Sequence, residues 1–423
     1  MRAPSFNINN APSLALVAWL IALICGACVD NVSSPDFDGD GAPPRPDEDG
    51  PWAIAVVGTD YMSTSISILD PAEQELFREG VIHSGSTESG LSTALSGDVV
   101  LPRRYNPENR LVLIDRFPNS VLTFLDPEDF SVSGQLSVAT GFASNPHDFL
   151  WLDTHKAYVT RYEVNPRPGG AVNDGGDDIL IVDPTDHTIL GSVPLTSFAD
   201  DDLLARPDQM AEANDLVWIS LNHLSRDFGE AGGGLLVAVD PTTDKVAHRL
   251  TIPEARNCTA LVAASAKNAL YVSCSGLFIS EETHLYGWGT VVAVDLAVDP
   301  PTASFLRRAS ADDPRPYGFD LDFLPPKHLL AVRFGDLARD VPDLAVVIDV
   351  DNGEERVLHT ASSPYGMGGI LADPERGLVY VGDADSQRPR VYVYKLDGDN
   401  FKRIGEIETH PQSGLAPRHL RFY

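Results

Sequence analysis

The sequence predicts an all-β protein, a seven-bladed β-propeller made of four-stranded antiparallel blades. Three observations predict this fold. A short strand ending in Asp recurs seven times, further apolar strands accompany each recurrence, and the last residues form a strand with no sheet of its own. A period of about 50 residues with several strands per unit is typical of propellers and solenoids, not of separate domains.

The recurring strand ends at Asp residues that lie 48 to 57 residues apart: Asp70, Asp126, Asp183, Asp240, Asp295, Asp349 and Asp397. Pro follows each of the first four. A carboxylate at the end of a strand accepts backbone N–H groups of the following turn. We therefore expect these seven Asp side chains to be structural, not catalytic.

Each unit is expected to contain four strands joined by short turns. An apolar strand precedes the one that ends in Asp, as at 216–220 and 378–381, and another lies before it, as at 369–372. A fourth strand follows the Asp, as at 187–193 and 245–250. Four such strands form an antiparallel blade. No amphipathic helix of useful length separates the units.

The two ends of the repeat region complement each other. The first unit begins with its second strand at Ala53, whereas residues 416–423 form an inner strand without a blade. We expect this tail to complete the first blade, because closing the ring hides strand edges that would otherwise invite aggregation.

Residues 363–366 (SPYG), Asp373-Pro374, 378–381 (LVYV) and 391–394 (VYVY) resemble the YVTN-type propeller repeat. The resemblance covers nearly all of residues 51–423. It implies the fold but no single activity, because propellers of this superfamily include enzymes, electron-transfer subunits and binding modules.

Composition excludes some classes of function. Hydrophobic residues make up 43% of the 423 residues, too many for a disordered chain. The 31 basic and 61 acidic residues give a formal net charge of -30. Such a chain repels phosphate backbones and anionic lipid, so we expect no nucleic-acid binding. The same field favours cationic partners.

The amino terminus indicates export. Residues 14–24 are uninterruptedly apolar, about half of the roughly 20 residues that span a bilayer, so residues 1–28 are interpreted as a signal peptide. The stretch Cys25-Gly26-Ala27-Cys28 resembles a bacterial lipobox, which implies lipidation of Cys28, although Cys25 stands where Leu is usual. Ordinary cleavage and a retained anchor are the alternatives. We expect a lipid-anchored protein facing the periplasm or the cell surface, with membrane contact through the anchor only.

Residues 29–50 are interpreted as a disordered, acidic, Pro- and Gly-rich tether, and residues 51–423 as the propeller. Asp36, Asp38, Asp40 and Gly41 match the start of a calcium loop, with Asp47 near its twelfth position. The prolines between them argue against a calcium loop and favour a solvated linker.

Cys258 and Cys274 flank an expected hairpin that turns at residues 265–268. Counting outward from the turn places them nearly opposite each other, so we expect a disulfide in an oxidising compartment. Two buried free thiols are the alternative.

In propellers of this type, the loops entering inner strands and those joining second to third strands open on one face. Several Arg and His residues converge there, which suits an anionic or carbohydrate-like ligand or an acidic protein segment. The alternative is pairing between neighbouring blades. The candidate ligand-binding residues are His147, Asp148, Arg161, Glu163, Arg206, Asp208, His223, Arg315, Tyr317, Arg333, Tyr365, Arg418 and His419.

Catalytic and metal signatures are sparse. There is no Gly-x-Ser-x-Gly, phosphate loop, HExxH or haem-attachment motif. His147, His223 and His419 share the predicted face, but no regular spacing fixes them as metal ligands, so we expect no metal and no cofactor.

Three functions from different classes remain. The first is a monomeric, non-enzymatic module that binds a protein or a small molecule. The second is a lactonase-like hydrolase or lyase, in which His147, Glu163, Arg206 and His419 supply acid–base groups and bind a carboxylate. The third, an accessory subunit in periplasmic redox chemistry, follows from the resemblance alone.

Overall fold

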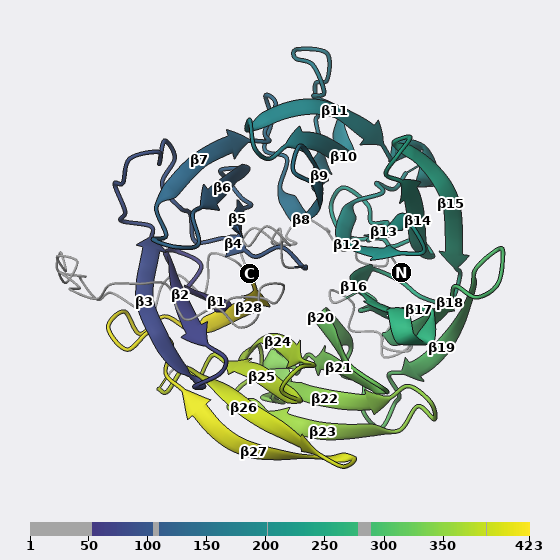
Figure 1. The fold of residues 1–423 in the computed structure, drawn as a ribbon. Coiled ribbons are helices and arrows are strands. Elements are labelled where there is room, and N and C mark those ends of the chain that lie inside the picture. The colour runs from purple at the N-terminus through teal and green to yellow at the C-terminus, as the bar shows by residue number, and fades with distance from the viewer. Residues whose placement is uncertain (1–52, 105–109, 201, 278–288, 386) are drawn as a thin grey trace, which may run out of the picture. The chain divides into compact units, whose positions relative to one another are not determined.

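The computed structural model describes residues 53–104, 110–200, 202–277, 289–385 and 387–423. They form seven four-stranded antiparallel sheets arranged as a ring, which confirms the predicted seven-bladed β-propeller (Figure 1). Cys28 and the 29–50 segment with its calcium-loop-like Asp residues lie outside the described residues. Within the described ranges no helix is both long enough and apolar enough to span a bilayer.

The strands follow one another from the inside of each blade to its outside. Blade 1 contains β28 (Pro417–Phe422), β1 (Ile54–Thr59), β2 (Thr64–Asp70) and β3 (Glu75–His83); blade 2 contains β4 (Val99–Val100), β5 (Leu111–Asp115), β6 (Val121–Leu125) and β7 (Val132–Ser137); blade 3 contains β8 (Pro146–Asp153), β9 (Lys156–Val164), β10 (Gly176–Asp183) and β11 (Thr188–Pro194). Blade 4 contains β12 (Pro207–Ala213), β13 (Leu216–Leu221), β14 (Gly234–Asp240) and β15 (Lys245–Ile252); blade 5 contains β16 (Cys258–Ala264), β17 (Ala269–Cys274), β18 (Thr290–Asp295) and β19 (Thr302–Arg308). Blade 6 contains β20 (Tyr317–Leu324), β21 (His328–Arg333), β22 (Leu344–Asp349) and β23 (Glu355–Thr360); blade 7 contains β24 (Met367–Asp373), β25 (Leu378–Asp383), β26 (Arg390–Asp397) and β27 (Asn400–Ile407). Short 3₁₀ turns lie at η2 (Thr196–Phe198), η3 (Ser265–Lys267) and η5 (Leu337–Arg339).

Seven apolar clusters form the core, one at each junction between adjacent blades. Each blade is covered on both faces, so every residue of β1, β2 and β10 is buried. This two-sided burial explains why the middle strands are apolar runs and not alternating patterns. The outermost strands face solvent on one side and do alternate, as in β15.

The tail closes the ring as predicted. β28 pairs antiparallel with β1, with Ile54 opposite Phe422 and Val56 opposite Leu420. Leu420 is fully buried and packs with Ile54 of blade 1 and Tyr380 of blade 7 in the seventh cluster. The two ends of the chain's repeat region are thus joined by backbone hydrogen bonds and by apolar packing.

The recurring Asp residues hold turns, as expected. Six of the seven accept backbone N–H bonds from residues two or three positions further on; Asp70, for example, binds Ala72 N at 2.7 Å and Asp183 binds Thr185 N at 2.8 Å. Among the hydrogen bonds of the described residues, Asp397 shows none of this kind. Gly398 follows it with a positive φ of 62°, which glycine adopts without steric strain because it has no Cβ.

Blade 2 departs from the expected pattern, because its inner strand β4 has only two residues. The chain leaves the ladder at Leu101, and Pro102, which lacks an N–H group, follows. Arg103 then continues along the axis of the ring.

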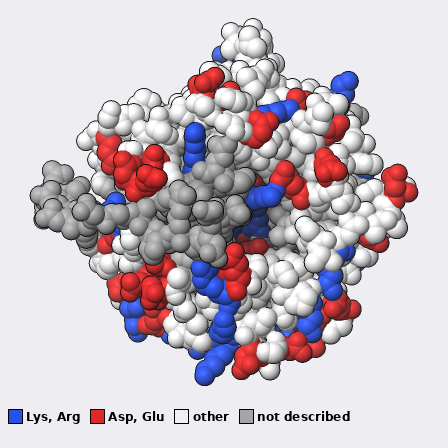
Figure 2. Space-filling model, viewed as in Figure 1, with Lys and Arg blue, Asp and Glu red and all other residues white. Residues whose placement is uncertain are grey.

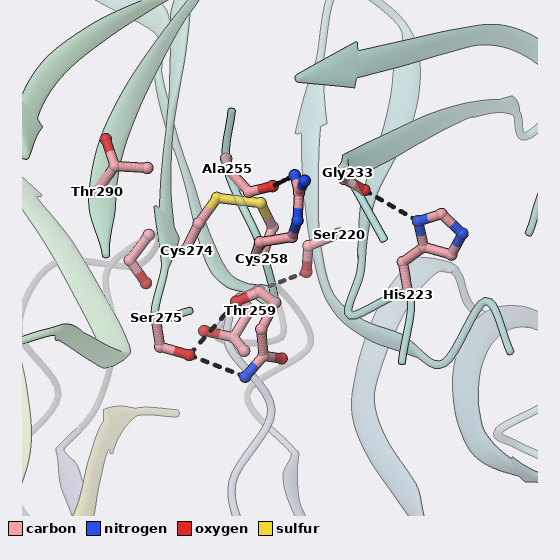
Figure 3. The surroundings of a disulfide bond; sticks show 12 residues. Ser220, His223, Gly233, Ala255, Cys258, Thr259, Cys274, Ser275 and Thr290 are labelled. Carbon is pink, nitrogen blue, oxygen red and sulfur yellow. Dashed lines mark hydrogen bonds between the residues drawn. A yellow bond between two sulfur atoms is a disulfide. The ribbon is translucent and has the colours of Figure 1, made fainter. Parts of the chain in front are cut away.

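The predicted disulfide between Cys258 and Cys274 is present and joins the opposed strands β16 and β17 (Figure 3). Both sulfurs are buried at the junction of blades 4 and 5. In the same region the Ser220 hydroxyl of blade 4 donates to the Thr259 carbonyl of blade 5. The bond therefore reinforces an inner hairpin beside an inter-blade contact.

Side chains cross the axis of the ring. Arg103 of blade 2 and Arg421 of blade 1 both pair with Asp320 of blade 6, and the Arg421 Nη2 to Asp320 Oδ1 distance is 2.6 Å. Gln209 of blade 4 donates to the Phe319 carbonyl of blade 6 at 3.0 Å. These contacts link blades that are not neighbours and fill the axis with buried polar groups.

His410, in the loop that leads into β28, makes ring closure sensitive to acid. Its Nε2 donates to the Ser65 carbonyl at 3.1 Å, and burial lowers its pKa from 6.5 to about 4. The unfolded chain takes up this proton at higher pH than the folded protein, so stability is lost as pH falls from 6.5 to 4. We expect His410 to account for about 3 kcal/mol of that loss.

The measurement is urea unfolding of wild type and His410→Gln between pH 4 and 7. The glutamine amide retains a donor for Ser65 but does not titrate, so the variant should lose less stability on acidification. An equal loss in both proteins would contradict the role given to His410.

Candidate functional site

The loops between second and third strands and the loops between successive blades emerge on one face, which we call the channel face. Backbone bonds tie the two kinds of loop together. The His223 N–H in the β13–β14 loop donates to the Ala205 carbonyl before β12, and Tyr162 N–H donates to the Asn145 carbonyl before β8. The sequence-predicted candidates are therefore carried by loops that brace one another.

A polar network centred on His147 lies at the mouth of the axis on this face. His147 Nδ1 is 3.0 Å from Asp208 Oδ1, and the imidazole stacks on the Tyr162 ring at 4.1 Å. Asn222 donates to Asp208 Oδ2 at 3.0 Å and accepts from the Tyr162 hydroxyl at 2.8 Å. Each side chain is therefore held by two others from blades 3 and 4.

The free nitrogen of His147 faces outward. Nε2 forms no hydrogen bond to a described residue, and it is not one of their buried, unpartnered atoms. The side chains of His147 and Asp208 are 14% and 11% exposed. A histidine oriented by a carboxylate through one nitrogen presents the other as a hydrogen-bond or proton acceptor.

Neighbouring charges keep Asp208 ionised. Burial alone would raise its pKa, but His147, Asn222 and Arg116 together hold the pKa below its ordinary value. Arg116 is itself paired with Asp98. Burial first, and then the nearby Arg116 and Arg421, lower the pKa of His419 to about 3, so His419 is neutral at physiological pH.

The Asp148 carboxylate binds backbone groups of three blades and is therefore structural. Its carboxylate accepts the backbone N–H groups of Arg103 at 2.9 Å, Phe149 at 2.9 Å and Met210 at 2.8 Å, which belong to three successive blades. It is 1% exposed, and burial raises its pKa to about 6. Its oxygens are directed at backbone, not at the channel mouth.

Arg161 is fully buried within blade 3. It forms a two-point pair with Asp178, with Nε to Oδ1 at 2.7 Å and Nη2 to Oδ2 at 2.6 Å. The remaining donors reach Thr140 Oγ1 and the Asn173 carbonyl. The hydrogen-bond donors of the guanidinium are thus bound by residues of the protein itself.

Arg206 and Glu163 pair with each other, at 2.7 Å between Nη1 and Oε1. The Arg206 guanidinium is fully buried and lies 4.8 Å from the Tyr162 ring centre and 4.1 Å from that of Phe228. Glu163 keeps 30% of its side chain exposed. This pair forms one wall beside the His147 network.

The candidates of blade 6 form a second network away from His147. Arg333 Nη1 lies 2.8 Å from both Asp313 Oδ2 and Glu355 Oε1, and the Tyr317 hydroxyl donates to Glu355 Oε2 at 2.5 Å. Arg315 Nε donates to Asp313 Oδ1 at 2.7 Å. Three of the predicted residues thus share two carboxylates.

The other candidates also have partners. His223 Nδ1 donates to the Gly233 carbonyl at 2.9 Å, and its Nε2 accepts from Asp200 N–H at 3.1 Å. Arg418 Nη1 donates to the Tyr365 carbonyl at 2.8 Å. The structure therefore brings His147, Asp208, Glu163 and Arg206 together around Tyr162, and Arg315, Tyr317 and Arg333 together in a separate network.

Sequence reasoning missed the partners that neutralise the arginines. Asp178 lies near the start of β10, 17 residues after Arg161, and the Arg103–Asp320 pair spans 217 residues. The only available signal was the recurrence of a basic residue at the end of the second strand, in Arg161 and Arg333. On the face shown in Figure 2, basic and acidic side chains lie in small interspersed groups.

Among the described residues one group has metal-ligand chemistry within 4.8 Å: His155, Asp183 and Asp186. It lies on the opposite face, where His155 Nδ1 is 3.0 Å from Asp183 Oδ2. In blade 6, Lys327 pairs with Asp349, the corresponding strand-end carboxylate. The group is therefore explained as a side-chain hydrogen bond at a strand-end turn.

Comparison with known proteins shows the fold and no more. No protein-family model and no curated protein matches the chain. The periplasmic gluconolactonase of Pseudomonas aeruginosa superposes with a TM-score of 0.57 at 13% identity over 88% of this chain and 98% of that one. Hydrazine synthase of Kuenenia stuttgartiensis gives 0.56 at 11% identity over 87% and 100%, and a candidate 6-phosphogluconolactonase of Bacteroides fragilis gives 0.56 at 11% over 90% and 100%. The YVTN-type resemblance stays a prediction.

The buried pair in blade 3 gives a test of whether Arg161 is structural. Arg161→Met leaves the Asp178 carboxylate buried without a partner and should destabilise the protein by about 3–5 kcal/mol. Adding Asp178→Leu should recover much of that loss, because the uncompensated charge is gone. Urea unfolding measures both, with Arg167→Met in an exposed loop as the control. A loss below about 1 kcal/mol for Arg161→Met would show that the pair is not structural.

Proposed function

We propose that this protein is an exported, lipid-anchored propeller that binds another protein through its channel face. The observation that carries the proposal is where exposed apolar side chains lie. Of thirteen large apolar residues exposed among the described ranges, eight are on the channel face. They are Tyr61, Met62, Phe117, Val172, Phe228, Phe319, Leu337 and Tyr365.

Seven of these residues lie in loops and Phe319 lies near the start of β20. They are substantially exposed, Met62 at 75% and Leu337 at 63%. Exposed apolar side chains concentrated on one face are typical of protein interaction sites. The opposite face has only Val298 from the same set, on the β18–β19 turn, and is otherwise lined by the strand-end Asp turns.

Charge indicates what kind of partner fits. Acidic residues stand beside the apolar tips: Asp60 before Tyr61, Asp227 before Phe228 and Asp336 before Leu337. The arginines that would attract an acidic partner are instead paired internally. A partner surface with apolar and basic side chains is therefore complementary to this face.

Export and anchoring are supported by the sequence and by one covalent bond. The Cys258–Cys274 disulfide suits an oxidising compartment. Cys28 is the proposed lipidation site.

The docking proposal predicts position-specific cross-linking in the producing cell. A photoreactive phenylalanine analogue at Phe117 or Leu337 should give a discrete protein adduct. The same analogue at Leu190 or Val357, which are 56% and 58% exposed on outer strands, should give none. The readout is a mass shift on denaturing gels. Adducts from all four positions, or from none, would remove the channel face as a docking surface.

A hydrolase is the second candidate, and the His147–Asp208 pair is the observation that favours it. The pair has the geometry of a general base with its orienting carboxylate. Glu163 and Arg206, which the lactonase-like hypothesis uses together with His147 and His419, pair with each other next to Tyr162.

This candidate predicts that the purified protein hydrolyses a sugar lactone and that His147→Ala lowers kcat about 10²–10⁴-fold. His155→Ala, on the opposite face, is the matched control and should not change the rate. Lactone hydrolysis is followed by proton release. If wild type gives no rate above buffer on a panel of aldonolactones, the hydrolase is rejected.

A further inference from the structure

Strongly exposed apolar side chains lie on two loops of blades 1 and 2, on the channel face. Met62 and Tyr61 in the β1–β2 loop are 75% and 61% exposed, and Phe117 in the β5–β6 loop is 60% exposed. Residues 96–98 form hydrogen bonds to both loops, to the Thr59 hydroxyl at 2.8 Å and to the Phe117 carbonyl at 3.2 Å. The two loops that carry these side chains are thus held together.

The backbone of the β1–β2 loop keeps Met62 in its exposed position. Asp60 Oδ1 accepts the N–H groups of Met62 at 2.9 Å and of Ser63 at 2.7 Å. Behind the loop, the backbone of Tyr61 and Met62 packs so closely on Gly97 that a Cβ would not fit there. A loop fixed on both sides in this way holds the Met62 thioether in solvent.

The other methionines of the described ranges are buried. The chain contains four methionines, and Met62, Met210 and Met367 are among the described residues. Met210 is 1% and Met367 is 6% exposed, and each packs in an apolar cluster between two blades. A dissolved oxidant needs access to the thioether sulfur to convert it to a sulfoxide. Of these three methionines, Met62 is therefore the one that an oxidant reaches in the folded protein.

We propose that oxidation of Met62 by a peroxide weakens docking at the channel face. The thioether sulfur donates an electron pair to one peroxide oxygen, so an S–O bond forms and the O–O bond breaks. Hydrogen peroxide is reduced to water, and methionine is oxidised to its sulfoxide, which methionine sulfoxide reductases convert back. The effect on docking rests on the proposed function, whereas the selective oxidation of Met62 does not.

The sulfoxide alters the chemistry of the docking surface without altering the fold. It replaces an apolar thioether by a polar S=O group, and burying this group against apolar side chains of a partner is unfavourable. The hydrogen bonds that hold the loop are made by backbone groups and Asp60, which the oxidation does not change. Weaker docking with unchanged stability is therefore the expected result.

The first measurement maps oxidation in the purified, folded protein. Dilute hydrogen peroxide should convert Met62 to the sulfoxide at least about 10-fold faster than Met210 or Met367, which react only after local opening. Mass spectrometry of the three methionine peptides gives the rates. Protein unfolded in urea is the control and should show no such selectivity. Equal rates at the three positions in the folded protein would overturn the proposal.

The second measurement uses the photoreactive analogue at Phe117 in the producing cell. Peroxide treatment before illumination should lower the yield of the protein adduct several-fold. Met62→Leu is the matched control, because leucine is apolar and does not oxidise, and it should keep its adduct after the same treatment. Met62→Gln is polar from the start and should give a low yield without peroxide. The unfolding temperatures of both variants verify that they are folded.

The outcomes separate this inference from the docking proposal. An equal loss of adduct in wild type and Met62→Leu would place the oxidation elsewhere and overturn the role of Met62, as would no loss in either protein. Docking itself would stand in both cases. Absence of an adduct at Phe117 before peroxide treatment would overturn docking, and with it the effect assigned to Met62.

Discussion

Packing of blade on blade is the constraint from which the other features follow. A four-stranded sheet of this size has two apolar faces, and neither can be left in water. In a ring each blade covers one face of each neighbour, so seven blades give seven junctions and seven apolar clusters. The last junction exists only because β28 belongs to blade 1 and packs against blade 7. Loops and turns are thereby displaced to the two ends of the ring, where sequence is free to vary and function resides.

Buried charge pairing determines which faces remain available for binding. The chain has about half as many basic as acidic residues, and it uses many arginines inside the fold, as in Arg161–Asp178 and Arg333–Glu355. Removing either partner leaves an uncompensated charge, so these residues hold the loops in place and are poorly suited to binding ligands. The groups that remain available for binding on the channel face are apolar side chains, acidic residues and Nε2 of His147.

Much of the fold could be predicted from the sequence because its signals are local and repeated. The strand-end Asp residues, the unpaired tail and the hairpin between Cys258 and Cys274 are each readable within a few residues. The arrangement of the candidate site was harder to predict from the sequence. Nothing near Arg161 or Arg206 in sequence shows that Asp178 or Glu163 will neutralise it, and Arg103 meets Asp320 across 217 residues. The short β4 depends on how neighbouring blades converge, which no single repeat encodes.

Pairing of β28 with β1 also sets when the protein can finish folding. β1 can pair with β28 only after Phe422, the partner of Ile54, has been synthesised. The inner edge of the first blade therefore stays unpaired during most of synthesis. Contacts between such distant parts of a chain form slowly, and incomplete chains expose strand edges and apolar faces. A chaperone that binds the nascent chain therefore binds an incomplete ring, and a product truncated before Pro417 lacks the strand that completes it.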